Sequence, residues 1–461
     1  MLTATLLLIL VHAGGLVLFG HLLLSRKSHA SLILWTLWLL LFPLLGIPLY
    51  LVLGTEKINR REMERFRATR HTHNSNAIPE NVDHVLDALR HVNGHELCTM
   101  ARPELLWDGD AYYDALLRDI EQAQRFVHIQ TYVWREDESG ERLLDALCNA
   151  ARRGVEVRIL LDEVGSMKTS RSFFGPLEEA GGYFSWYSTV QTRRSRFFFN
   201  LRNHRKVNVV DGKVAYVGGM NIGEEYAGRG IGPWQDLQMR FEGEVLRTLE
   251  NTFAEDWSFA TREQLNDARY YPEQPPAGDH FPAVVVKTGP DKADLSFLKC
   301  FSILCHAARE RLDVFTPYFV PNEHLLVTLE IAAARGVRVR LMIPTLNEHM
   351  YMVDIGRANY EPLMEAGVEV YELPGMVHHA KVLRVDGDLV FAGSHNLDIR
   401  SYKLNFELSL CFRDRPTAEA MGRHFDELFR RAEKVDLGRF HNRSLGTKLR
   451  QGFVRLFGPI L

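Results

Sequence analysis

The chain has 461 residues, of which 46% are hydrophobic and 25% are charged, and its formal net charge is −3. This length allows two or three domains of ordinary size, and the small net charge argues against a protein that binds nucleic acid through a broad positive potential. The five cysteines are scattered and form no Cys-x-x-Cys pair. They favour reduced thiols facing a cytosol-like compartment and give no support for a zinc site.

The first 56 residues are predicted to form a transmembrane hairpin. Two apolar stretches, about 2–24 and about 32–53, contain no charged residue, and each is long enough to cross a bilayer core as a helix. The alternative for the first stretch is a cleavable signal peptide, but it has neither a positively charged start nor a small-residue cleavage site. The alternative for the second is a buried core helix, and aromatic residues towards its ends, Trp35, Trp38 and Tyr50, favour a membrane span instead.

The charges beside these stretches predict their orientation. The short loop between them carries only Arg26 and Lys27, whereas six basic residues follow the second stretch between positions 57 and 70. By the positive-inside rule, the N-terminus and everything after the hairpin lie on the cytoplasmic side of the cell's inner membrane. Residues 57–100 are polar and basic at their start, so we expect a juxtamembrane linker with one short helix.

Two similar blocks follow, at 101–269 and 283–440, joined by a proline-rich linker at 270–282. Each block contains a β-like run, a stretch of helical spacing that ends at a glycine, and a second β-like run. In the first block these segments are Phe126–Trp134, Leu143–Gly154 and Val155–Val164, and in the second they are Leu312–Val320, Leu325–Gly336 and Val337–Pro344. This order predicts an α/β fold, duplicated within the chain, with parallel strands flanked by helices.

Late in each block the chain repeats one motif. The stretch "NHRKVNVVDGKVAYVGGMN" spans 203–221, and "HHAKVLRVDGDLVFAGSHN" spans 378–396. Five residue types recur at the same spacing, namely His204, Lys206, Asp211, Gly218 and Asn221 in the first copy and His379, Lys381, Asp386, Gly393 and Asn396 in the second. The Asp-Gly pair predicts a tight turn between two short strands. The His and the Lys are two residues apart, so they share one face of a strand.

The motif residues together suit chemistry on a phosphodiester. Lysine and asparagine offer donors to an anion, and a neutral imidazole can attack phosphorus or move a proton. Two half-sites brought together across a pseudo-two-fold axis would stabilise the extra negative charge of a five-coordinate state. One His would form a phosphohistidine, and the other would protonate the leaving alkoxide and then deprotonate the incoming hydroxyl. The lysines supply the positive charge, so we expect no metal and no other cofactor.

Each reacting histidine needs a carboxylate on its far nitrogen. Asp236 follows the first motif and Glu407 follows the second, both in apolar, strand-like surroundings. We expect Asp236 to orient His204 and Glu407 to orient His379. Asp211 and Asp386 are counted with the catalytic residues of the motif, although their place beside the turn favours a role in fixing the strand geometry.

With these two motifs the chain resembles the phospholipase D superfamily, because both copies of H-x-K-x4-D-x6-G-x-x-N are complete. More narrowly, it is similar to bacterial cardiolipin synthases with two membrane spans. That similarity rests on the N-terminal hairpin with "PLLGIPLYLVLG", on "FTPYFVPNEHLL" and "GSHNLDIRSYKLNFE", and on the tail "RLFGPIL". Gly219 stands where the first motif would often have serine, while Ser394 retains the hydroxyl in the second copy. We expect Ser394, Asn221 and Asn396 to support the phosphate.

The resemblance implies two tandem phospholipase D-like α/β sandwich units and a transphosphatidylation. One phosphatidylglycerol would give a phosphatidyl-enzyme and release glycerol, and a second would accept the phosphatidyl group, giving cardiolipin. The two motifs are equivalent, so the residues alone leave open which His attacks; the resemblance implies His204 as the nucleophile and His379 as the acid and base. Phosphatidylglycerol and anionic membrane lipids are the expected partners, and the oligomeric state and the possible use of phosphatidylethanolamine stay open.

Three alternatives are kept at this point. A phospholipase D would transfer the phosphatidyl group to water, a membrane-anchored nuclease would use the same centre, and a non-catalytic lipid-binding module would require a broken motif. Five arginines and three phenylalanines between Thr192 and Lys206 could stack nucleobases or meet a lipid interface. The tail, 441–461, has Leu449, Phe453, Leu456 and Phe457 at helical spacing, with Lys448, Arg450 and Arg455, and could lie in the membrane surface or pack on the domain.

Overall fold

The computed structural model describes residues 2–24, 29–51, 83–92, 96–187, 201–273, 280–290, 295–347 and 350–455. The chain divides into two units, one formed by residues 1–62 with 189–200 and the other by residues 63–188 with 201–461. The larger unit carries both copies of the repeated motif. The charged flanks that predict the orientation of the hairpin, the arginine- and phenylalanine-rich residues 192–200, and Leu456 and Phe457 of the tail lie outside the described residues.

The described part of the smaller unit consists of helices α1 (Leu2–Leu23), α2 (His29–Leu41) and α3 (Pro43–Leu49). The second apolar stretch was predicted to be one helix over 32–53, and this is wrong. Its helix stops at Leu41 and a new one starts at Pro43, because proline has no backbone N–H with which to continue the preceding helix. Among the helices of the described residues, none combines the length and apolar character needed to cross a membrane.

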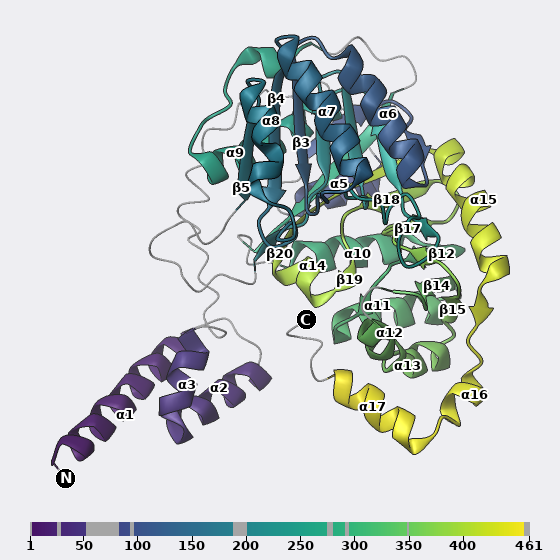
Figure 1. Ribbon diagram of the computed structural model, residues 1–461. Helices are drawn as coiled ribbons and strands as arrows, with labels where there is room; N and C mark the ends of the chain where they lie inside the picture. Colours follow the sequence, from purple (N-terminus) through teal and green to yellow (C-terminus); the bar gives the residue numbers. More distant parts are fainter. Residues whose placement is uncertain are drawn as a thin grey trace. The chain divides into compact units, whose positions relative to one another are not determined.

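The first half of the larger unit is built on a seven-stranded sheet with the order β2-β10-β8-β7-β3-β4-β5. The strands β3, β4 and β5 pair in parallel, as the repeated order of strand, helix and strand predicts. The remaining neighbours in this sheet pair antiparallel. The bounds are β2 (Glu104–Leu106), β3 (Phe126–Thr131), β4 (Glu156–Asp162), β5 (Tyr183–Tyr187), β7 (Val207–Val210), β8 (Val214–Gly218) and β10 (Gln238–Phe241). Helices α6 (Gly109–Gln122), α7 (Glu138–Arg152) and α8 (Gly175–Glu179) cover one face (Figure 1).

The second half repeats this order as β11-β20-β18-β17-β12-β14-β15, with β1 and β21 added at its edges. The predicted duplication is therefore confirmed strand by strand. The bounds are β11 (Phe281–Thr288), β12 (Arg311–Phe315), β14 (Arg338–Pro344), β15 (Glu369–Leu373), β17 (Val382–Val385), β18 (Leu389–Gly393), β20 (Asn405–Arg413) and β21 (Glu433–Lys434). Its helices include α5 (His84–His91), α10 (Ser296–Ala307), α11 (Glu323–Ala334), α12 (Met350–Arg357) and α13 (Tyr360–Glu365).

One strand comes from a segment that was predicted to be linker. Residues 96–100 form β1 (Glu96–Met100), which pairs antiparallel with β11 of the second half. Leu97 and Met100 are buried on this strand, in different core clusters, so burial on both faces explains why the segment joins the sheet. The linker prediction for 57–100 is therefore wrong at its end.

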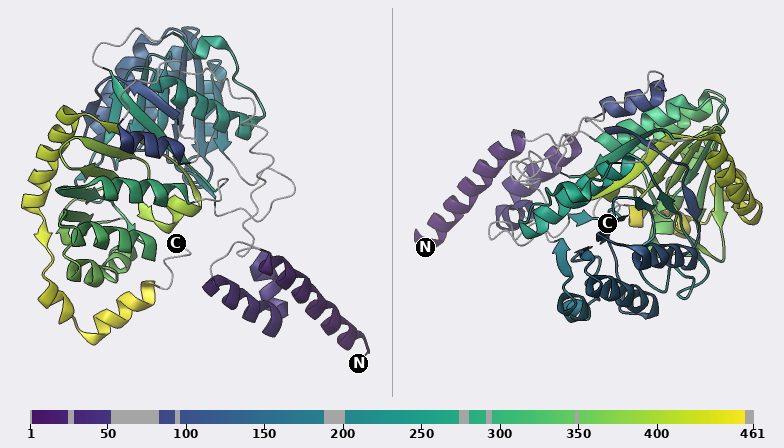
Figure 2. Two further views of the ribbon diagram at one scale, coloured as in Figure 1. Left: turned by 180° about the vertical axis from the view of Figure 1, so that it is seen from behind. Right: turned by 90° about the horizontal axis from the view of Figure 1, so that it is seen from above.

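The two halves of the larger unit lie against each other (Figure 2), and they share one hydrophobic core. Helices α9 (Val245–Thr261) and α15 (Arg415–Arg431) pack in the same hydrophobic cluster as residues of both sheets, such as Val207 of the first and Val382 of the second. Separate clusters lie under the outer helices of each half. Because the two halves are packed as one body, side chains at their common boundary can build a single site.

The C-terminal segment forms α16 (Leu437–His441) and α17 (Leu445–Arg455). Helix α17 packs beside α12, where Arg450 pairs with Asp354 at 3.0 Å and Gln451 is buried. Leu445, Leu449 and Phe453, which recur every four residues on the other side of the helix, are 71%, 65% and 62% exposed. The predicted tail helix therefore packs on the domain through one face, while the apolar side chains of another face are mostly exposed.

Candidate active site

Each repeated motif forms a β-hairpin, β7–β8 in the first half and β17–β18 in the second. In the first hairpin Asp211 and Gly212 both have positive φ, 54° and 62°, as a type I′ turn requires. The Asp211 carboxylate accepts hydrogen bonds from the backbone N–H groups of Gln124, Arg125 and Phe126 at the start of β3. Asp386 likewise accepts from the N–H groups of residues 309–311 at the start of β12. Both aspartates thus fix strand geometry, and their observed contacts do not support the catalytic role in which they were counted.

The two halves exchange short strands beside the motifs. Strand β6 (Arg202–Asn203), just before His204, pairs with β20 of the second half, and the His204 N–H donates to the Phe406 carbonyl at 2.9 Å. Strand β16 (Val377–His378), just before His379, pairs with β9 (Trp234–Gln235) of the first half. The His379 N–H donates to the Gln235 carbonyl at 2.7 Å. Each histidine is therefore held against the backbone of the other half.

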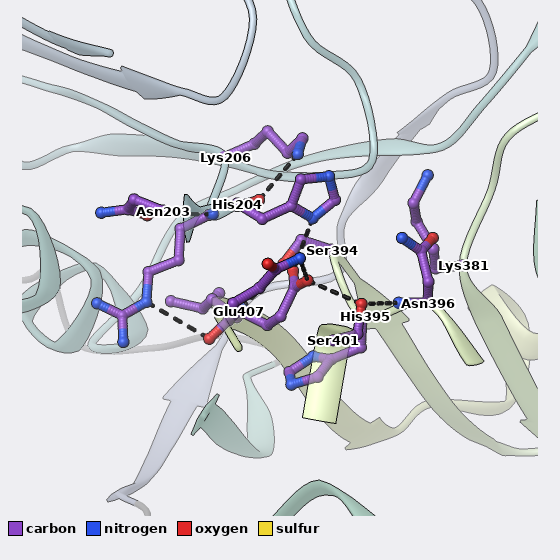
Figure 3. Close-up of polar contacts among 12 residues, drawn as sticks. Asn203, His204, Lys206, Lys381, Ser394, His395, Asn396, Ser401 and Glu407 are labelled. Atoms are coloured by element: carbon purple, nitrogen blue, oxygen red, sulfur yellow. Dashed lines mark hydrogen bonds and ion pairs between the residues drawn. The ribbon is translucent and has the colours of Figure 1, made fainter. Parts of the chain in front are cut away.

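This exchange decides which carboxylate each histidine meets. His204 Nδ1 donates to Glu407 Oε2 at 2.9 Å (Figure 3), and His379 Nδ1 lies 2.7 Å from Asp236 Oδ2. The predicted pairing, Asp236 with His204 and Glu407 with His379, is wrong, and the observed pairing is crossed. The carboxylates directly follow the residues whose carbonyls bind the two histidine N–H groups, so the strand exchange carries each histidine to the carboxylate of the opposite half.

The two lysines lie at the same centre and are almost completely buried. Lys206 Nζ donates to the His204 carbonyl at 2.8 Å. Lys381 Nζ donates to the His379 carbonyl, lies 2.6 Å from His379 Nδ1 and is 3.7 Å from Asp236 Oδ2. Burial lowers the pKa of Lys206 to about 7 and that of Lys381 to about 8, and the charge of Lys381 further lowers the pKa of Lys206. The effect of Lys381 on Lys206 indicates that the two half-sites form one centre.

Glu407 is the more heavily bonded of the two carboxylates. Besides His204, it accepts hydrogen bonds from Ser394 Oγ at 2.5 Å and Ser401 Oγ at 2.9 Å (Figure 3). It also accepts one from Asn405 Nδ2 at 3.2 Å. Burial would raise the pKa of Glu407, but His204 foremost, together with His395 and Lys206, lowers it to about 2. Sequence reasoning missed Ser401 and Asn405; two amide or hydroxyl side chains within six residues of a carboxylate in an apolar segment were the available signal.

Asp236 has fewer partners. It accepts from the Leu237 N–H at 2.7 Å and faces His379 and Lys381. Burial raises its pKa, and the charges of Lys381 and His379 lower it below the usual value. Both carboxylates are therefore ionised at neutral pH, each beside a histidine of the opposite half.

Of the three residues Asn221, Ser394 and Asn396, predicted to support phosphate, the first two make side-chain contacts within the protein. The Asn221 side chain accepts from Thr131 Oγ1 and the Val133 N–H, and it donates to the Tyr226 hydroxyl. The Ser394 hydroxyl donates to Glu407 and accepts from the Leu408 N–H. Both residues thus hold the walls of the site together, and their predicted support of phosphate stays a prediction. Asn396 is different, because its Oδ1 is buried and has no hydrogen-bond partner among the described residues.

The histidines are buried and enclosed by aromatic rings. His204 and His379 are only 8% and 6% exposed. The Tyr132 ring lies 4.9 Å from that of His204, and the Trp234 ring lies 5.4 Å from that of His379. Burial lowers the pKa of His204 to about 4 and that of His379 to about 3. Both rings are therefore neutral at pH 7, as a nitrogen nucleophile must be.

The residues that could hold a metal ion lie outside the histidine centre. Within the described residues, the only acidic and histidine side chains grouped closely enough to hold an ion are Glu361, Glu365 and His441, on α13 and α16. None of them belongs to the histidine centre. At that centre Lys206 and Lys381 supply the positive charge.

Comparison with known proteins agrees with this geometry. A family model described as "Cardiolipin synthase, PLD-like domain" matches residues 116–257 and 303–429, which contain both repeated motifs. The chain belongs to this family. Among its curated relatives in the family are the "Probable cardiolipin synthase YwiE" of Bacillus subtilis strain 168, 31% identical over 97% of this chain and 92% of the relative, and "Cardiolipin synthase 1" of Bacillus cereus, 29% identical over 95% of this chain and 90% of the relative.

A solved structure supports the fold independently. The phosphatidylserine synthase of Haemophilus influenzae Rd KW20 superposes with a TM-score of 0.62, covering 82% of this chain and 98% of that protein, at 14% sequence identity. This chain therefore shares its fold with that structure, and the family model that matches both halves identifies the duplicated α/β architecture as phospholipase D-like.

Proposed function

We propose that the protein is a cardiolipin synthase that transfers a phosphatidyl group from one phosphatidylglycerol to another. The observation that carries the proposal is the crossed centre, where two neutral histidines are each oriented by a carboxylate of the opposite half and flanked by two lysines. Such a centre can attack phosphorus, move a proton and stabilise the negative charge that develops on phosphate. The family supplies the substrate class, since its curated relatives bear the name of this activity.

His204 is the proposed nucleophile. Its Nδ1 proton is donated to Glu407, which fixes the tautomer and leaves the lone pair of Nε2 available. Ser394, Ser401 and Asn405 hold Glu407 in place from three other directions. In the first step His204 Nε2 bonds to phosphorus, and the bond from phosphorus to the glycerol oxygen breaks.

His379 is the proposed acid and base. Its Nδ1 faces both Asp236 and the Lys381 ammonium, so its proton is less firmly assigned to one tautomer than that of His204. A bound phosphodiester offsets the lysine charges that lower the pKa of His379, and therefore favours the protonated ring that donates to the leaving glycerol oxygen. In the second step His379 takes the proton of the incoming hydroxyl, whose oxygen bonds to phosphorus as the bond to His204 breaks.

The test uses purified full-length protein in mixed micelles with radiolabelled phosphatidylglycerol and no divalent metal. We expect labelled cardiolipin and free glycerol from the intact protein and neither from His204→Ala. Phosphatidic acid as the main product would favour the alternative of a hydrolase. Absence of lipid turnover together with cleavage of added single-stranded DNA would favour the nuclease.

We also propose that the smaller unit anchors the protein in the inner membrane through residues 2–24 and 32–53, with the larger unit on the cytoplasmic face. The uncharged, leucine-rich composition of these stretches and the basic residues after them support this placement. All five native cysteines are buried, so a cysteine placed at the exposed Ser172 provides a selective probe. A membrane-impermeant maleimide should label Ser172→Cys in inverted vesicles but not in intact spheroplasts; the reverse result would overturn the orientation.

The apolar face of α17 is proposed to rest on an anionic lipid surface. Leu445, Leu449 and Phe453 are exposed, and Lys448 and Arg455 lie beside them on the helix, a pattern typical of interfacial helices. An environment-sensitive fluorophore on Leu449→Cys should be quenched by brominated phosphatidylglycerol in vesicles, whereas the same label on Ser172→Cys should not. Equal quenching at both positions, or none at either, would contradict this placement.

A further inference from the structure

One buried hydrogen-bond donor beside His379 is not used in the two proposed steps. Trp234 lies on β9, two residues before Asp236, and residues two apart on a strand share one face. The centres of the Trp234 and His379 rings are 5.4 Å apart. Trp234 is 5% exposed, and its Nε1 is buried with no hydrogen-bond partner among the described residues. An unpaired buried donor destabilises a folded protein, and an acceptor atom on the substrate would pair it.

The equivalent position in the other half is paired within the protein. Trp234 and Asn405 each precede a carboxylate by two positions, and each pairs through its backbone with the residue two positions before a reacting histidine. Asn405 donates its amide to Glu407 at 3.2 Å, whereas the Trp234 N–H donates to no described residue. The two halves therefore differ at this position, and the unpaired donor belongs to the half-site of His379.

The proposed substrate offers an acceptor for this donor in both steps. The oxygen that His379 protonates in the first step and the hydroxyl that it deprotonates in the second both belong to a glycerol head group. In each case the next carbon of the glycerol carries another hydroxyl. Because the Trp234 and His379 rings are neighbours, a glycerol whose reacting oxygen lies at His379 can reach the indole N–H with this other hydroxyl. Its oxygen would accept the hydrogen bond and would not take part in bond making or breaking.

The same surroundings suit an ethanolamine head group poorly. In ethanolamine the carbon next to the reacting one carries an ammonium, which donates hydrogen bonds and accepts none, and an indole N–H is also only a donor. Lys381 Nζ lies 2.6 Å from His379 Nδ1, so a positive charge already lies beside the histidine and would repel a second one. A hydroxyl therefore fits this place better than an ammonium does.

We propose that the Trp234 indole N–H donates a hydrogen bond to the non-reacting hydroxyl of glycerol, and so selects glycerol head groups over ethanolamine and over simple alcohols. This inference rests on the proposed function, since it names a residue that recognises the substrate of the same reaction. The lysines contact the phosphate, whereas Trp234 contacts the head group.

The test compares three small alcohols as acceptors. Purified full-length protein receives radiolabelled phosphatidylglycerol with equal concentrations of propanol, propylene glycol and alaninol, which carry a hydrogen, a hydroxyl and an ammonium on the carbon next to the reacting one. All three attack the same phosphatidyl-enzyme, so the ratios of their products report the second step alone. We expect the propylene glycol product to exceed the propanol product about fivefold, as one neutral hydrogen bond allows, and alaninol to give the least product.

Trp234→Phe keeps an aromatic ring but removes the N–H. In this variant the preference for propylene glycol over propanol should fall about fivefold, so that the two products form in nearly equal amounts. Trp186→Phe removes another half-buried indole, on β5, and should keep the preference of the intact protein. Because both products come from one intermediate, a smaller folded fraction lowers them together and leaves their ratio unchanged.

Equal use of propanol and propylene glycol by the intact protein would overturn the inference, as would an unchanged preference in Trp234→Phe. A preference of the intact protein for alaninol would also overturn it, and would indicate that the aromatic rings around His379 bind a cation. The measurements on the intact protein do not depend on the folding of any variant. Failure of the proposed function gives a different result, in which the intact protein forms phosphatidic acid but no cardiolipin.

Discussion

The two halves of the active site share one strand order and one motif, yet they hold their histidines differently. The second half offers Glu407, bonded by Ser394, Ser401 and Asn405. The first half offers the shorter Asp236, and Gly219 takes the place of the serine; a Cβ at Gly219 would lie 2.2 Å from Asp236 Oδ1. The position of the Asp236 carboxylate therefore requires glycine there. A duplicated scaffold has become asymmetric at the residues that set the basicity of each ring.

The difference assigns a separate task to each histidine. His204 meets a carboxylate with many partners and has one fixed tautomer, which suits a nucleophile. His379 shares its Nδ1 between Asp236 and Lys381, which suits a group that gains and loses a proton during each turnover. Removal of either imidazole ring, or a change in the groups that contact it, should therefore affect the two histidines differently.

Removal of the histidines should give the largest effect. We expect His204→Ala to lose both glycerol release and cardiolipin formation by about 10³-fold or more, because no phosphohistidine can form. In His379→Ala the loss should be about 10²- to 10⁴-fold, because proton transfer is removed while the nucleophile remains. Initial rates of glycerol release measure both variants, with thermal unfolding as a check of folding. A variant that keeps more than a tenth of the activity would contradict the shared centre.

The crossed carboxylates come next. Glu407→Gln and Asp236→Asn should each lower kcat by about 10²-fold, because the ring loses the partner that fixes its orientation and charge. A double-mutant cycle on the free energy of unfolding, obtained from thermal melts, tests which carboxylate is paired with which histidine. His204 and Glu407 should show a coupling of about 1–3 kcal/mol, and His204 and Asp236 a much smaller one. Stronger coupling within the same half would restore the pairing predicted from sequence.

The lysines predict the pH dependence. In the free protein the pKa of Lys206 is lowered to about 7 and that of Lys381 to about 8, mainly by burial. Each lysine loses its proton as the pH rises through its pKa, so kcat/KM should decline above about pH 7, first through Lys206 and then through Lys381. A bound phosphate anion raises both pKa values, and kcat should therefore decline only at higher pH. Superimposable profiles for kcat and kcat/KM would contradict this account.

The smallest effects are expected at the equivalent positions 219 and 394. Gly219→Ala should lower kcat about tenfold, because the added Cβ pushes Asp236 away from His379. Ser394→Ala removes one of several bonds to Glu407, worth about 1 kcal/mol, so a loss of about fivefold is expected. Steady-state kinetics on the two variants compares the halves directly. Equal tolerance of both substitutions would mean that the asymmetry has no catalytic consequence.

Much of this architecture follows from the sequence, for definite physical reasons. The repeated order of strand, helix and strand predicts the two sheets, and the Asp-Gly pairs predict the hairpins that present His204 and His379. Both predictions succeed because turn geometry and strand periodicity are local properties. The two carboxylates, Asp236 and Glu407, are also found from the sequence, because each follows a motif in an apolar, strand-like segment. Their assignment to the histidines fails because β6 and β16 are only two residues long, and their pairing depends on how the halves pack.

Other misses have the same origin. Asn221 and Ser394 have the chemistry to bind phosphate, but they also bond to the loops and strands around them, which the motif spacing does not predict. Ser401 and Asn405 acquire their role only because α14 and β20 bring them to Glu407. Hydropathy alone predicts one helix over 32–53, whereas Pro43 divides it. Local patterns identify the reacting groups, and tertiary contacts decide what each group touches.

The most direct test of the separate roles of His204 and His379 is to locate the covalent intermediate. Full-length protein is mixed with phosphatidylglycerol labelled in its phosphate, quenched in alkali to preserve phosphohistidine, digested, and mapped by mass spectrometry. The account predicts label on His204 alone, with greater accumulation in His379→Ala if the remaining first step still proceeds. Label on His379, or label shared equally between the two rings, would contradict it.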